Sequence, residues 1–111
     1  MAYDEELAQR IRALVATQRS LTEKKMFGGL AFLVGGNMAI AASGQGGILV
    51  RTDPERSDQL VATTKAAVAV MRGRPMAGWL RVGPEDVRTK RQLAKWVDLG
   101  IGYARSLPAK G

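Results

Sequence analysis

The 111-residue sequence contains neither cysteine nor histidine. Without cysteine the chain can form no disulfide and no thiolate nucleophile, and its composition suits the reducing cytoplasm. Without histidine it has no imidazole for acid–base catalysis and no side chain whose ordinary pKa lies near neutrality. Together the two absences exclude Ser-His triads and zinc sites built from thiolates or imidazoles. We therefore expect a protein with no catalytic residues, no cofactor and no bound metal.

Long hydrophobic runs are also missing. The longest apolar stretch is interrupted by Gly35, Gly36 and Asn37, so no transmembrane helix is expected. The N-terminal residues "MAYDEELAQR" are acidic and polar, unlike a secretory signal. We expect a soluble cytoplasmic protein that makes no membrane contact. The length fits one domain over residues 1–111.

Acidic side chains are scarce in the second part of the chain. Residues 1–64 hold seven basic and seven acidic side chains, whereas residues 65–111 hold ten basic and three acidic ones, so the net charge of +7 arises in the last segment. A positive field attracts nucleic acid or acidic protein surfaces. The candidate contacts for such a partner are Arg72, Arg74, Arg88, Lys90, Arg91 and Lys95. Aromatic residues are few, and none alternates with these cations as a base-stacking set would require.

Amphipathic helices are predicted near both ends of the chain. Over residues 4–18, apolar residues recur at helical spacing behind Asp4, a suitable N-cap. Over residues 91–107, an apolar face that includes Trp96 opposes a charged face, so we expect Trp96 in the core. A further helix is predicted to begin at Asp53, where a capping residue precedes a proline.

Short apolar runs between glycine-rich turns predict the strands of an antiparallel sheet, the first three forming a meander. The predicted strands cover residues 27–34, 37–43, 47–51 and 78–82. Residues 65–72 fit either a continuation of the second helix or an alternating strand, and the sequence leaves this choice open. The order α-β-β-β-α-β-β-α predicts an α+β fold, a two-layer α/β sandwich with helices packed on an antiparallel sheet.

The stretch "EKKMFGGLAFLVGGNM" combines lysines with glycines, as phosphate-binding loops do. A P-loop places its lysine after the second glycine and before a helix, whereas Lys24 and Lys25 precede the glycines and strands follow. The Rossmann spacing G-x-G-x-x-G is also absent. Gly35 and Gly36 instead suit a tight hairpin. We interpret "SLTEKK", residues 20–25, as a loop entering the first strand, and the two lysines have no assigned role.

A second unusual stretch is "MRGRPMAGW", residues 71–79. Two interpretations of its large apolar side chains remain open. Met76 and Trp79 either cover an edge of the sheet or join Arg72 and Arg74 in an exposed hot spot for a protein partner.

These segments carry a family resemblance. "KKMFGGLAFLVGGNMA", then "GRPMAGW", then a final helix with Trp96 and "ARSLP" resemble the N-terminal domain of the TfoX/Sxy competence regulators, in particular the small proteins made of that domain alone. The resemblance runs from about residue 4 to residue 108. The positions that match the motif, without an assigned role, are Lys24, Lys25, Met26, Phe27, Gly28, Gly29, Asn37, Gly73, Arg74, Pro75 and Met76.

The resemblance implies a two-layer α+β domain of secretion-chaperone-like shape, often dimeric, and a regulatory role in bacteria. Two-domain members act as coactivators of competence genes with the cAMP receptor protein. Our leading hypothesis is a non-enzymatic regulatory or protein-interaction module, a homodimer with a protein partner, linked to transcription or competence. Two alternatives stay open: a basic nucleic-acid-binding accessory protein, and a carrier of a small ligand in a pocket between the sheet and the helices.

Overall fold

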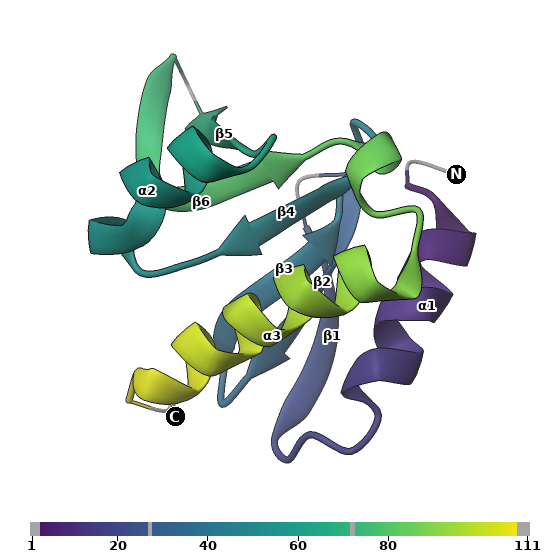
Figure 1. The fold of residues 1–111 in the computed structure, drawn as a ribbon. Coiled ribbons are helices and arrows are strands. Elements are labelled where there is room, and N and C mark those ends of the chain that lie inside the picture. Colours follow the sequence, from purple (N-terminus) through teal and green to yellow (C-terminus); the bar gives the residue numbers. More distant parts are fainter. Residues whose placement is uncertain (1–2, 27, 72, 109–111) are drawn as a thin grey trace.

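The structure is a computed structural model that describes residues 3–26, 28–71 and 73–108. One antiparallel sheet carries three helices on one side (Figure 1). The elements in chain order are α1 (Glu5–Val15), β1 (Leu21–Met26), β2 (Gly29–Val34), β3 (Asn37–Ala42), β4 (Ile48–Arg51), a 3-10 turn (Pro54–Arg56), α2 (Ser57–Thr63), β5 (Ala67–Met71), β6 (Arg74–Val82), a second 3-10 turn (Pro84–Asp86) and α3 (Lys90–Ser106). The six strands lie in the order β1-β2-β3-β4-β6-β5. The predicted α+β class, with helices packed on an antiparallel sheet, is confirmed.

One prediction for the first part of the sheet is wrong. Residues 20–25 are not a loop, because Leu21–Met26 form the edge strand β1, which pairs with β2 and places Lys24 opposite Ala31. The four central residues of β1 are exposed and polar. Such a strand has no apolar alternation to detect, and charged side chains are a common protection of a sheet edge. The meander therefore has four strands instead of three.

The open choice for residues 65–72 is settled over the part that the structure describes. Ala67–Met71 is the strand β5, paired antiparallel with β6. β6 begins at Arg74, earlier than the predicted residue 78, and the pairing of the two strands shifts register after Val68. The alternating pattern "AVAVM" thus outweighs the helical spacing that residues 65–72 share with α2.

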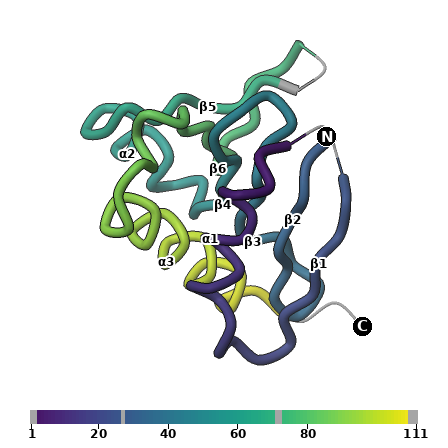
Figure 2. The backbone as a smooth tube through the Cα atoms, turned by 90° about the vertical axis from the view of Figure 1, so that its right-hand side faces the viewer, coloured from purple at the N-terminus to yellow at the C-terminus, as the bar shows by residue number. Residues whose placement is uncertain are grey.

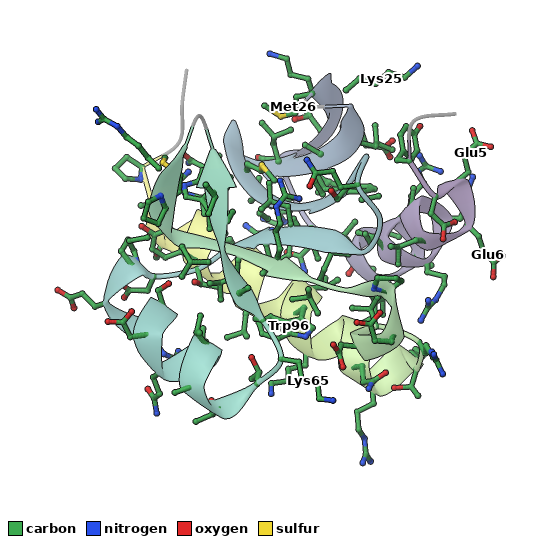
Figure 3. All side chains as sticks on the ribbon, turned by 90° about the horizontal axis from the view of Figure 1, so that it is seen from above. Glu5, Glu6, Lys25, Met26, Lys65 and Trp96 are labelled. Carbon is green, nitrogen blue, oxygen red and sulfur yellow. The ribbon has the colours of Figure 1, made fainter. Side chains whose placement is uncertain are left out.

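The main core lies between the sheet and the helices. It joins Ile11 of α1, Leu60 of α2 and Trp96 of α3 to strand residues such as Ile40 and Leu80. Trp96 is 4% exposed, which confirms its predicted place in the core, and Figure 3 shows it between the helical layer and the sheet. The predicted bounds of α1 and of α3, the helices nearest the two ends of the chain, are confirmed within a few residues. We call this side of the sheet the covered face.

Local capping explains where the helices begin. The Asp4 carboxylate accepts a hydrogen bond from Leu7 N at 3.1 Å, as predicted for an N-cap. At the start of α3, Thr89 and Gln92 form a reciprocal capping box, with both hydrogen bonds at 3.1 Å. The sequence "TKRQ" carries the S/T-x-x-E/Q pattern of that motif.

Candidate functional site

The opposite side of the sheet is apolar although no described helix covers it. Its buried cluster consists of strand residues alone: Ala31, Met38, Ala41, Leu49 and Ala69. We call this side the open face. Leu49 is only 4% exposed there, so something other than a helix must shield it from water.

Side chains of the sheet itself provide that shielding, since Met26, Leu33 and Trp79 pack against the cluster, and curvature of the sheet brings its outer strands closer. β1 and β5 are the two outermost strands, yet Met26 of β1 and Val70 of β5 line the same pocket. A flat sheet would hold these strands far apart, because neighbouring strands are about 4.8 Å apart. The two ends of the sheet therefore curl toward each other over the open face. Figure 2 shows the tips of the β1–β2 and β5–β6 hairpins on the same side of the molecule.

The curled sheet encloses a pocket of about 830 Å³, which we call the open-face pocket. Among the described residues, its lining combines apolar side chains with two arginines and contains no acidic residue. The lining residues are Met26, Gly29, Ala41, Ala42, Ser43, Gln45, Leu49, Val70, Arg74, Met76 and Arg81. A concave apolar site with a few convergent polar groups is the usual form of a ligand or peptide site.

Arg81 is one of the two cations that line this pocket. It stands on β6 opposite Leu49 of β4, so its side chain shares the open face with that leucine. Arg81 Nη1 donates a hydrogen bond to Ser43 Oγ at 3.2 Å. Ser43 Oγ also accepts one from the backbone N–H of Gln45 at 3.1 Å, which fixes the serine in the β3–β4 turn. The guanidinium is thus held in place while most of its N–H donors remain available.

The two motifs that carry the family resemblance meet at this pocket. "KKMFGG" lies at the β1–β2 hairpin and contributes Met26 and Gly29, whereas "GRPM" lies at the β5–β6 hairpin and contributes Arg74 and Met76. The two hairpins belong to opposite ends of the sheet and are distant in sequence. Only the curvature brings the motifs together.

Three of the residues that match the family also have structural roles. A side chain on Gly29 would overlap the carbonyl oxygen of Ala42 on β3, so close backbone packing requires glycine there. Gly28 has a positive φ of 74° next to the hairpin turn. Asn37 is buried, and its Nδ2 donates to Pro108 O at 2.9 Å, which ties the start of β3 to the chain after α3.

Lys24 and Lys25 project to opposite sides of the sheet. Lys24 lies across from Ala31 on the open face, and Lys25 lies across from Leu30 on the covered face. Both lysines are exposed, and Figure 3 shows Lys25 pointing away from the molecule. Since they do not face a common point, the pair cannot grip one phosphate together. The matching residue Phe27 lies outside the described residues.

The six candidate contacts for a nucleic-acid or acidic partner fall into separate places. Arg88, Lys90, Arg91 and Lys95 are exposed around the start of α3, in the helical layer. Arg74 belongs to the open-face pocket on the other side of the sheet. Arg72 lies outside the described residues. The structure thus groups four of the six cations and separates them from Arg74.

The segment before α3 is tied to α1 by the side chain of Arg10, which donates to two backbone carbonyl oxygens. Arg10 Nη2 donates to Val87 O at 2.8 Å and to Arg88 O at 3.0 Å. Lys95 places its ammonium 5.7 Å from the centre of the Trp96 ring. No salt bridge joins any cation of this group to an acid among the described residues.

Met76 and Trp79 have different environments on the open face. Met76 is 37% exposed at the rim of the open-face pocket. Trp79 is half-buried against the open-face cluster, and the Arg51 guanidinium lies 5.2 Å from its ring centre. Of these two large apolar side chains, the methionine is the exposed one, and it lines the pocket together with Arg74.

Sequence reasoning missed Arg81, Ser43 and Leu49 as site residues. The signal for Arg81 was present in "GWLRV", where a cation stands between Leu80 and Val82 in a predicted strand. Because side chains alternate along a strand, that cation must point away from the core that its neighbours enter. The pattern carries no signal for Ser43, which reaches the site only through the β3–β4 turn.

The part of the chain described here has no cluster of acidic side chains with the geometry to hold a metal ion. No described helix is both long and apolar enough to cross a membrane. The fold and the site therefore define an α+β domain with a pocket on a sheet face that no described helix covers.

The comparison with protein families agrees with this class. The TfoX N-terminal domain matches residues 13–104, and the chain belongs to that family. The match includes every element of the sheet and nearly all of α3. A comparison with curated protein sequences finds no match.

Proposed function

We propose that this protein is a non-enzymatic regulatory module that binds a protein partner through the open face of its sheet. The observation that carries the proposal is the convergence of both sequence motifs on the open-face pocket. Val70 is 59% exposed and Met76 is 37% exposed at its rim, next to Arg74. Methionine, arginine and aromatic side chains are enriched in protein interfaces, and exposed apolar groups gain most from being covered.

The family adds the setting of this proposal. The resemblance to competence regulators favours a role in transcription or competence in the cytoplasm of a bacterium. The absence of histidine and cysteine from the sequence supports a role in binding instead of catalysis. The acidic partner expected from the charge of the chain suits the two arginines of the pocket.

The test is site-specific photocrosslinking in the native cell, with nuclease treatment as a variable. A photoreactive residue at position 76 should capture a defined protein whether or not nuclease is added. The matched control places the same residue at Gln9, which is exposed on α1 in the helical layer. Equal capture at both positions would contradict the proposal. So would an Arg74→Ala variant that loses the adducts only because it no longer folds.

A second candidate function, nucleic-acid binding, is favoured by the exposed cations at the start of α3. The same experiment addresses it with the photoreactive residue at Arg91. Adducts that are lost on nuclease treatment at this position would support a nucleic-acid contact. Protein adducts that resist nuclease at position 76 alone would instead support the leading proposal.

We also propose that two copies pair through β5, since the two edges of the sheet differ. β1 exposes Glu23, Lys24 and Lys25, which discourage strand pairing, whereas the edge strand β5 carries alanine and valine from Ala67 to Val70. Light scattering should then give twice the chain mass, and Ala67→Lys should return the mass to that of a monomer. Lys24→Val on the other edge is the matched control and should leave the dimer intact.

A further inference from the structure

We propose that the open-face pocket binds a small molecule with an apolar body and a carboxylate head group. This proposal goes beyond the proposed protein-interaction function and is independent of it. It rests on three features of the pocket: a fixed donor group at one end, a lack of acidic residues, and an apolar wall that is partly exposed in the free protein.

The donor group consists of Arg81 and Ser43. Ser43 Oγ accepts hydrogen bonds from Arg81 Nη1 and from Gln45 N. The serine O–H is therefore free to donate, and Arg81 keeps further N–H donors on its planar fork. A carboxylate is the oxyanion whose two oxygens match such a fork in a bidentate contact.

Three other arginines have partners within the protein. Arg12 pairs with Glu23 at 2.7 Å, Arg105 donates to Gln18 at 2.7 Å and 2.9 Å, and Arg51 stacks near the rings of Trp79 and Tyr103. Arg81 has a neutral hydroxyl as its partner. Within the described residues, neither Arg81 nor Arg74 forms a salt bridge, and no acid lines the pocket. The described lining thus offers cations to a bound anion and no acid that would repel it.

The remainder of the pocket is suited to an apolar body. Leu49 forms the floor, and Met26 and Met76 approach from the two ends of the sheet. Methionine is flexible and adapts to ligand shape. The volume of about 830 Å³ lies in the range of sites for small molecules, and covering Val70 and Met76 would remove exposed apolar surface.

The location differs from the one expected of a ligand carrier in the sequence analysis. A carrier with a pocket between the sheet and the helices was one open alternative, and the main core lies between those layers. The open-face pocket lies on the opposite side of the sheet, so a ligand can enter without opening the core.

Calorimetric titration with decanoate, below its micellar concentration, tests the proposal. Decanol has the same chain length without the charge, and its affinity is compared with that of decanoate. We expect saturable binding of one decanoate per chain and at least tenfold weaker binding of decanol. Arg81→Met should weaken decanoate binding at least tenfold and leave decanol binding unchanged. Arg91→Met removes the same charge from α3 outside the pocket and should change decanoate affinity less than twofold.

Methionine methyl NMR locates the ligand. Addition of decanoate should shift the methyl signals of Met26 and Met76, which substitution by leucine assigns. If Arg81→Met does not fold, Ser43→Ala carries the test, because it removes the hydroxyl donor while the guanidinium remains. It should weaken decanoate binding about threefold to tenfold.

Four results would overturn the proposal: no saturable binding of decanoate, equal affinity for decanoate and decanol, equal effects of Arg81→Met and Arg91→Met, or unshifted Met26 and Met76 signals. None of these measurements requires a protein partner. Their failure would leave the protein-interaction proposal standing, and failure of the crosslinking experiment would leave ligand binding standing.

Discussion

The two faces of the sheet are buried to a similar degree by different means. On the covered face, Leu80 and Ile40 are fully buried under helices that fill the space above them. On the open face, Leu49 is 4% exposed because the sheet curls, and an open pocket lies beside it. Low exposure of a residue therefore does not show that its surroundings are closed. A covered face is closed by packing, whereas a curled face combines burial with an accessible pocket.

The largest expected effect compares the same substitution on the two faces. Leu80→Ala should lower the free energy of unfolding by about 3–5 kcal/mol, because it leaves a closed cavity in the core. Leu49→Ala should cost about 2 kcal/mol, close to the transfer term alone, because the space it leaves opens into the pocket. Urea unfolding of both variants provides the measurement. Equal losses would mean that the open face is as tightly packed as the covered one.

An intermediate effect tests how closely α3 approaches the covered face. A side chain on Gly100 would overlap the carbonyl oxygen of Ala39 on β3, so Gly100→Ala should destabilise the protein by about 1–3 kcal/mol. Gly102 lies two positions along the same helix with no atom within 4 Å of an added Cβ. Gly102→Ala should stabilise by about 0.5–1 kcal/mol through helix propensity. Thermal unfolding that showed the same sign for both variants would contradict the close approach.

The smallest expected effect concerns the ion pair at the rim of the covered face. Arg12 of α1 donates two hydrogen bonds of 2.7 Å to Glu23 of β1, and these bonds lower the pKa of the Glu23 carboxyl. A carboxyl with a pKa lower in the folded than in the unfolded state stabilises the fold above its unfolded pKa, and this contribution is lost as the pH falls through the folded value.

Glu23→Gln should therefore lower stability slightly at pH 7 and not at a pH below the pKa of the folded carboxyl. The loss should be smaller than that of Leu49→Ala, since both partners are partly exposed and solvent weakens the pair. Urea midpoints measured across this pH range check the prediction. The double variant Arg12→Gln, Glu23→Gln is the control, and a difference that persists at low pH would exclude the ion pair as its cause.

The periodicity of apolar residues was sufficient to predict a helix or strand where one face of the element is apolar and the other is polar. It predicted α1 with its Asp4 cap, α3 with buried Trp96, and strands around Phe32 and Ile40. It failed at β1, whose polar residues resemble a loop because an edge strand is exposed on both sides. It also left β5 undecided, because "AVAVM" follows a helix without a clear stop.

The candidate site was harder to predict than the helices and strands, because it combines residues from distant segments. The two motifs were recognised separately, and the cations Arg74 and Arg88 were assigned to one surface on charge alone. Arg74 instead joins Arg81 on the open face, and Arg88 lies with α3 on the other side. Which cations share a surface depends on strand order and on the side from which each side chain projects.

The sequence by itself determined the chemistry available to this protein and its local structure. It excluded thiol and imidazole chemistry, placed the glycine turn at Gly35 and Gly36, and specified most helices and strands through their periodicity. Only the tertiary structure decided that Met26, Met76 and Arg81 line the same pocket. The physical reason is that local patterns fix which side of a strand faces the core, whereas the curl of the sheet results from the packing and twist of all six strands together.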